Sequence, residues 1–179
     1  MMLCDEAARA EGLKQEREQP LRVCFVCTGN TCRSPMAQAV ANALAAKSLA
    51  AIPESMRDCA TLPVEAFSAG LFAREGDPIA ENAVKVLKAA GVAPVAKHDY
   101  RMHTAHTLTD AMATEYDLLV GMSGGHVIEL MMRYPHLAGR IVCMPSPISD
   151  PFGGDEACYR ACLSEIEAGV KKLLFEEGL

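Results

Sequence analysis

The chain has 179 residues, of which 50% are hydrophobic, and a formal net charge of −6 from 17 basic and 23 acidic side chains. This length suits one domain with a substantial core, and the hydrophobic fraction excludes a disordered polypeptide. The acidic balance argues against a nucleic-acid-binding protein, which needs a basic face, and no apolar run approaches the length of a membrane span.

Residues 1–20 are polar and charged and end in Gln19-Pro20. We therefore predict an N-terminal extension over 1–20, ahead of a single domain over 21–179. The extension lacks the long apolar stretch of a signal peptide. The eight cysteines are scattered through patterns typical of strands and helices, so we expect free thiols in a reducing cytoplasm rather than a disulfide framework.

Strand and helix patterns alternate along the chain. Leu21–Val26 is an apolar, β-branched run that predicts a buried strand, and further strands are expected over Val64–Ser68, Asp117–Met122 and Arg140–Met144. An alanine-rich helix is expected to open at Ser34-Pro35. A second is expected over Ile79–Ala90, with Asp77 as N-cap and Pro78 in its first turn, and a third from Ser123 to about Tyr134.

The last helix has one apolar face, formed by Tyr159, Cys162, Ile166, Val170 and Leu173. Alternating strands and helices indicate an α/β fold with a parallel sheet and helices on both faces. Ligands of such sheets bind at the carboxyl ends of the strands, where the strand order switches. Cys27 follows the first strand and is therefore expected at such an end.

The most informative segment is Cys27–Ser34, which lies between a predicted strand and a predicted helix. The backbone N–H groups of such a loop can surround a phosphate dianion at the start of a helix. Arg33 can add a two-pronged guanidinium contact. The same positive surroundings favour the thiolate of Cys27, which makes it a nucleophile. The pattern predicts phosphate transfer to sulfur.

Three segments resemble one family and occur in that family's order: Val23–Ala39, Phe67–Ala73 and Asp150–Gly154. The first is similar to the phosphate loop of the low-molecular-weight protein tyrosine phosphatases, and it is closest to their bacterial protein-arginine phosphatase branch. The resemblance covers the chain from about Leu21 onward. It implies a three-layer, doubly wound, flavodoxin-like (Rossmann-like) fold with a four-stranded parallel sheet ordered 2-1-3-4.

The resemblance also implies a reaction, namely hydrolysis of phosphorylated protein side chains through a phosphocysteine intermediate. Cys27 would attack phosphorus, and Asp150 would serve as general acid and then as base. The phosphate would be held by Arg33 and the loop residues Thr28, Gly29, Asn30, Thr31, Cys32 and Ser34. Positioning and electrostatics can carry this chemistry, so we expect no metal and no cofactor. Asp155 competes locally with Asp150 but is expected to cap the final helix.

Asn30, Ser34, Ser68 and His98 match positions that form a hydrogen-bonded brace under the phosphate loop in this family. Asn30 is expected at a positive φ, which such a brace would hold in place. Gln38 replaces an acidic residue common in the arginine branch and is expected on the helix surface. His98, His103 and His106 also raise a metal-site alternative.

Cys32 lies five residues after Cys27. It could form a reversible disulfide with Cys27 and protect the nucleophile from irreversible oxidation. The alternative is a buried spectator thiol, and the sequence does not separate the two.

Thr31 and Phe152 are the candidate selectivity residues. Tyrosine-directed members usually carry a branched aliphatic residue at the position of Thr31, whereas the arginine-directed branch carries Thr, whose hydroxyl can contact a guanidinium. The ring of Phe152 could stack on a planar guanidinium or on a phenol. Phosphoarginine is therefore favoured, and phosphotyrosine is the alternative. The segment His98–His103 departs from the branch pattern.

The two alternatives to a phosphatase are an arsenate reductase and a non-catalytic phosphate-binding module. An arsenate reductase would use the same loop but needs relay thiols, and no cysteine lies between Phe67 and Val142. A non-catalytic phosphate-binding module would be expected to have lost Cys27, Arg33 or Asp150. Phosphorylated proteins are the expected partners, as substrates, with no nucleic acid and no membrane. The sequence does not indicate an oligomeric state.

Overall fold

The computed structural model describes residues 19–52 and 64–175, so most of the predicted extension over 1–20 lies outside the described residues. Four strands form one parallel sheet: β1 (Leu21–Cys27), β2 (Val64–Gly70), β3 (Leu118–Gly121) and β4 (Ile141–Cys143). Their order is β2-β1-β3-β4, which confirms the predicted fold class and strand order.

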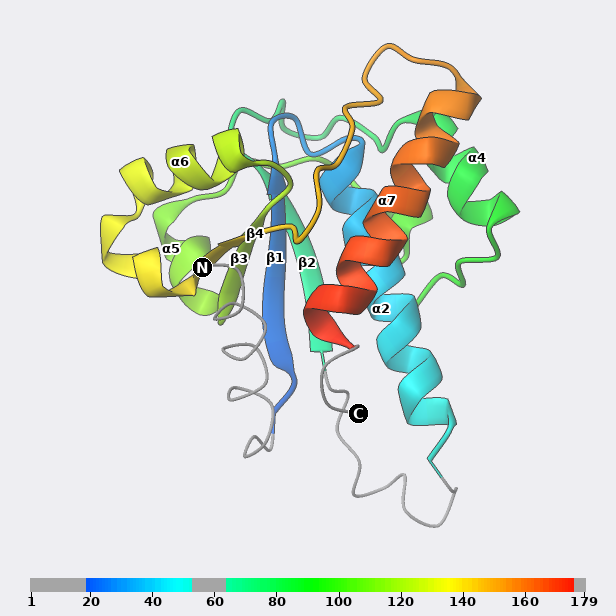
Figure 1. The fold of residues 1–179 in the computed structure, drawn as a ribbon, viewed down its shortest axis with the longest axis horizontal. Helices are drawn as coiled ribbons and strands as arrows, with labels where there is room; N and C mark the ends of the chain where they lie inside the picture. The colour runs from blue at the N-terminus through cyan, green and yellow to red at the C-terminus, as the bar shows by residue number, and fades with distance from the viewer. Residues whose placement is uncertain (1–18, 53–63, 176–179) are drawn as a thin grey trace.

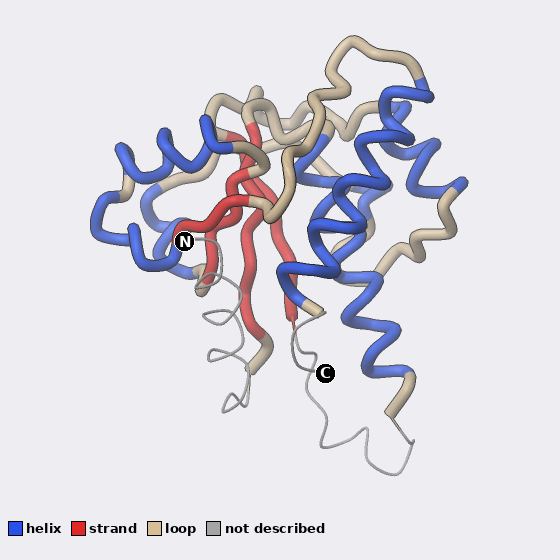
Figure 2. The backbone as a smooth tube through the Cα atoms, in the orientation of Figure 1, coloured by secondary structure: helices blue, strands red, loops and turns tan. Residues whose placement is uncertain are grey.

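Helices cover both faces of the sheet and make a three-layer molecule (Figures 1 and 2). One face carries α2 (Arg33–Ala50), α4 (Glu81–Ala89) and α7 (Glu156–Leu174). The other carries α5 (Asp110–Glu115), α6 (Gly124–Arg133) and the 3-10 helix Pro135–Arg140. A second 3-10 helix spans Tyr100–Met102. No helix in the described part of the chain is long and apolar enough to cross a membrane.

The central strand β1 is buried on both faces. Val23 and Phe25 pack toward the α2 and α7 layer, whereas Cys24 and Val26 pack toward the α5 and α6 layer. A strand covered on both sides takes apolar residues at successive positions, which explains the hydrophobic run from Val23 to Cys27; Arg22, near the start of the strand, is half-buried. Burial of this strand fixes the position of Cys27 at its carboxyl end.

The helix α4 begins later than its local signals predicted. It starts at Glu81 with Ala80 as N-cap, so Asp77 and Pro78 do not open it. Pro78 instead forms an antiparallel bridge with Thr104, and the backbone N–H of Ala80 donates to the carbonyl of Thr31 at 2.8 Å. These long-range contacts keep the segment extended and outweigh the local capping pattern.

The final helix starts as the sequence predicted. The carboxylate of Asp155 accepts a hydrogen bond from the backbone N–H of Cys158 at 3.0 Å and caps α7. The expected apolar face is buried, with Tyr159, Cys162, Ile166, Val170 and Leu173 each at most 5% exposed.

A buried asparagine joins α2 to the edge strand β2. The Asn42 side chain donates to the carbonyl of Ala66 at 2.8 Å and accepts from the Ala66 N–H at 2.9 Å. These two backbone groups point away from β1, and leaving one of them buried without a partner would cost about 1–3 kcal/mol. Asn42 therefore fixes how α2, which carries the end of the predicted phosphate loop, lies against the sheet.

Candidate active site

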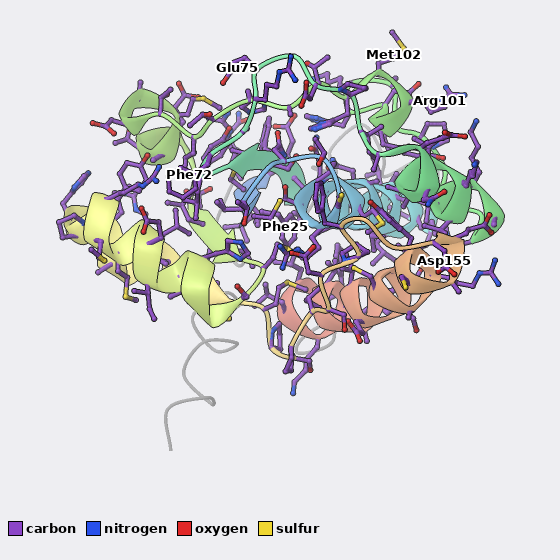
Figure 3. All side chains as sticks on the ribbon, turned by 90° about the horizontal axis from the view of Figure 1, so that it is seen from above. Phe25, Phe72, Glu75, Arg101, Met102 and Asp155 are labelled. Carbon is purple, nitrogen blue, oxygen red and sulfur yellow. The ribbon has the colours of Figure 1, made fainter. Side chains whose placement is uncertain are left out.

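The predicted phosphate loop lies at the carboxyl end of β1, between its two neighbouring strands β2 and β3. Cys27 is the last residue of β1, and α2 begins at Arg33. Figure 3 looks onto this edge of the sheet, with Phe72 just after β2 and Asp155 just before α7 labelled. This is the topological switch point at which ligands of doubly wound sheets bind.

Cys27 is 3% exposed, and its sulfur is held by two polar groups. The backbone N–H of Asn30 donates to Cys27 Sγ at 3.3 Å, and the Ser34 hydroxyl lies 3.0 Å from the same atom. Hydrogen bonds of this kind stabilise negative charge on sulfur. Both groups can donate a hydrogen bond to this sulfur.

Asn30 is the centre of the predicted brace. Its φ is 55°, and its side-chain amide donates to Ser34 Oγ and Ser68 Oγ, each at 3.0 Å. Its Oδ1 accepts from the backbone N–H of His106 at 3.1 Å, and its carbonyl accepts from His103 Nε2 at 2.8 Å. The structure therefore brings Asn30, Ser34 and Ser68 together as expected.

The expectation for His98 is wrong. His98 Nε2 hydrogen-bonds to Glu65 Oε1 at 3.0 Å, and its ring packs edge-on against Phe67, so its partners are not those of the brace. His103 and His106 support Asn30 instead. The sequence marked all three histidines but gave no signal for which of them would reach the loop, because the packing of the segment around Tyr100–Met102 decides it.

Gln38 also differs from expectation. Rather than lying free on the helix surface, its Oε1 accepts a 2.6 Å hydrogen bond from Ser68 Oγ. Gln38 stands one helical turn after Ser34, so both face β2. That i, i+4 spacing is the signal that could have placed Gln38 in the brace.

The three histidines are committed to separate partners rather than to one centre. Within residues 19–52 and 64–175, no group of three or more His, Cys, Asp or Glu side chains gathers as a metal site.

Arg33 and Asp150 meet although 117 positions separate them. Arg33 Nη2 donates to Asp150 Oδ2 at 2.7 Å, with the guanidinium side chain 9% exposed and the carboxylate side chain 54% exposed. Both line a pocket of about 310 Å³ together with Cys27, Thr28, Gly29, Thr31, Cys32 and Phe152. The three predicted catalytic side chains thus share one pocket.

Cys32 is buried against α7. Its sulfur lies 3.1 Å from the hydroxyl of Tyr159 and 3.6 Å from that of Thr31. Burial, followed by the bond to Cys32, raises the pKa of Tyr159 above its ordinary value, so the phenol keeps its proton. The disulfide with Cys27 stays a prediction.

Sequence reasoning missed His126. Ser123 is the N-cap residue of α6, as predicted, but its hydroxyl bonds to His126 Nδ1 at 2.7 Å instead of capping the helix backbone. His126 Nε2 in turn lies 3.1 Å from Thr28 Oγ1 in the phosphate loop. The i, i+3 spacing of Ser123 and His126 gave a faint signal for this pair.

The profile of the family described as "Low molecular weight phosphotyrosine protein phosphatase" matches residues 22–178. The chain belongs to this family. This member is 33% identical over 165 residues to the protein-arginine-phosphatase of Geobacillus stearothermophilus, covering 86% of this chain and 94% of that one. It is 30% identical over 153 residues to a probable low molecular weight protein-tyrosine-phosphatase, EpsP, of Ralstonia nicotianae, covering 83% and 90%.

Solved structures agree with this family membership. The low molecular weight protein tyrosine phosphatase of T. tengcongensis has a TM-score of 0.72 at 34% identity, covering 86% of this chain and 97% of that one. The YwlE arginine phosphatase of Geobacillus stearothermophilus has a TM-score of 0.69 at 31% identity, covering 87% and 91%. The predicted resemblance to this family is confirmed, and both of its branches are represented among the relatives.

The brace can be tested by removing its central hydroxyl. Ser68→Ala deletes the acceptor for Asn30 and the donor to Gln38, so the loop loses support while Cys27 and its own contacts remain. We expect kcat on p-nitrophenyl phosphate to fall by about ten- to a hundredfold, because small misplacements of catalytic groups are costly. Gln38→Glu keeps the oxygen acceptor and should stay within about threefold of the parent. Equal effects of the two substitutions would contradict the role of the brace.

Proposed function

We propose that this chain hydrolyses phosphorylated protein side chains through a phosphocysteine intermediate, with phosphoarginine as the favoured substrate. The observation that carries the proposal is the shared pocket, in which the Cys27 sulfur, the Arg33 guanidinium and the Asp150 carboxylate stand at the start of α2. Membership of a phosphatase family supports the same class of reaction.

In the first step, Cys27 attacks phosphorus in line, and the bond between phosphorus and the leaving atom breaks. Its electron pair goes to the leaving nitrogen or oxygen, which takes a proton from the carboxylic acid of Asp150. Loop N–H groups and Arg33 hold the equatorial oxygens. Arg33 has further N–H donors besides the one bonded to Asp150, so it can hold phosphate and carboxylate together.

In the second step, water attacks the phosphocysteine, and the Asp150 carboxylate accepts the proton of that water. The sulfur–phosphorus bond breaks, and the electron pair returns to sulfur. The N–H of Asn30 and the hydroxyl of Ser34, both directed at Cys27 Sγ, stabilise the departing thiolate.

Thr31 supports phosphoarginine as the substrate, and Phe152 fits a planar group of either kind. Thr31 lines the pocket, and its hydroxyl, which lies 3.6 Å from Cys32 Sγ, can offer an acceptor to a guanidinium. Phe152 is 80% exposed at the rim, where its ring can stack on a planar group. A phenol could stack there too, so phosphotyrosine is the competing substrate. A direct comparison of the two substrates decides between them.

Replacement of the nucleophile tests the mechanism. Cys27→Ser should abolish turnover of p-nitrophenyl phosphate while the variant still binds inorganic phosphate, because the loop N–H groups and Arg33 remain. Cys158→Ser, which alters an exposed thiol on α7, serves as the control and should keep full activity. Turnover within tenfold of the parent in Cys27→Ser would rule out this nucleophile.

The role of Asp150 is tested by varying the leaving group. Asp150→Ala should lose about two to four orders of magnitude in kcat on a substrate whose leaving atom needs a proton. The loss in kcat should be much smaller on p-nitrophenyl phosphate, because p-nitrophenolate leaves without being protonated. If both substrates lose the same factor, Asp150 acts through structure rather than as an acid.

Thr31→Ile tests the substrate class. A hydroxyl facing the guanidinium is replaced by a larger apolar group, which leaves buried guanidinium donors poorly paired. Phosphoarginine turnover should weaken by about 1–3 kcal/mol of transition-state binding, whereas phosphotyrosine turnover should hold or rise. The ratio of the two kcat/KM values cancels any general damage to the loop. A ratio that does not move toward tyrosine would remove the main support for phosphoarginine.

A further inference from the structure

His126 is a buried histidine beside the phosphate loop, at 7% exposure in the first turn of α6. The close approach of α6 to the sheet depends on Gly121 at the end of β3. A Cβ at Gly121 would lie 2.7 Å from Val127 Cγ2 and 3.3 Å from His126 Cβ. Because β3 pairs with β1, this approach carries the imidazole to the first residue of the loop, Thr28.

The two partners of the imidazole are both hydroxyls. Nε2 lies 3.1 Å from Thr28 Oγ1, and Nδ1 lies 2.7 Å from Ser123 Oγ. A hydroxyl can donate or accept, so the pair satisfies the neutral ring in either tautomer and also the doubly protonated ring. His126 can therefore gain a proton without losing either hydrogen bond.

Two charged groups of the active site act on His126. Burial lowers the pKa of His126, Arg33 on α2 lowers it further, and Asp150 in the loop after β4 raises it. On α6 itself, Arg133 and Glu129 pair with each other at 2.7 Å. Burial and the Arg33 guanidinium therefore both favour the neutral ring.

A dianion in the loop would reverse this balance. It would offset the positive charge of Arg33 and add negative charge next to Thr28, and both changes favour the imidazolium. Binding and protonation of His126 would then strengthen each other, since linkage between two sites is reciprocal.

We propose that His126 is a positioning residue that takes up a proton from solvent when a phosphate-like dianion binds in the loop. The inference rests on the proposed function, because it requires the loop to bind such an anion. The His126 imidazole titrates at a lower pH in the free protein than in the complex. Anion affinity therefore rises as the pH falls through the range between these two titration midpoints. Release of the product phosphate is accompanied by release of this proton.

The titration of the ring itself is the first test, and it uses the unaltered protein. Sulfate is the probe, since it stays a dianion across pH 5–8 and brings no titrating proton of its own. The imidazole ring signals of the five histidines are followed by NMR as the pH is varied, with and without sulfate. The signal that is absent from the spectrum of His126→Gln is assigned to His126. The His126 midpoint should move to higher pH with sulfate, while that of exposed His136 stays fixed. An unmoved or lowered His126 midpoint in the sulfate complex overturns the proposal.

Affinity gives the second test. His126→Gln keeps an amide that can bond both hydroxyls but cannot take a charge, and His136→Gln is the matched control. The gain in sulfate affinity from pH 7.5 to pH 5.5, measured by calorimetry, should be about fivefold smaller in His126→Gln than in His136→Gln. Equal gains overturn the role of His126 alone. If sulfate fails to bind the control at either pH, the phosphate loop itself is refuted, and the proposal with it.

Discussion

The left-handed backbone of Asn30 is the constraint on which the site depends. Few residues adopt a positive φ without strain, and asparagine is among those that tolerate it. The turn there directs an N–H at the Cys27 sulfur, and the side chain and carbonyl of Asn30 reach four further partners. Those partners belong to α2, to β2 and to the segment before α5. The conformation of the loop therefore depends on how these elements pack around the sheet.

Local sequence patterns were sufficient to predict the strand, loop and helix cap that surround the candidate site. The apolar run of β1 was visible because both of its faces are buried, and Asp155 was recognised as a cap from its position before an amphipathic helix. Cys27 and Arg33 lie within one short loop, so their proximity needed no knowledge of the fold. Asp150 came from the family resemblance, since an aspartate before a proline is common in turns.

What the sequence did not give depends on contacts between distant segments. His103 and His106 lie more than seventy positions from Asn30, and nothing local distinguishes them from His98. The start of α4 was misplaced because a bridge to Thr104 keeps Pro78 out of the helix. The role of Asn42 was not predictable from the sequence, because it depends on the outer edge of β2 lying beside α2.

The two side chains proposed to recognise the substrate are separate from those that shape the loop. The Thr31 side chain and the exposed ring of Phe152 line the pocket but take no part in the network around Asn30. A substitution at either position can therefore change the recognised group while the loop keeps its form. On the proposed function, preference among phosphorylated side chains can therefore change through single substitutions at Thr31 or Phe152, while the network around Asn30 that holds the Cys27 sulfur stays intact.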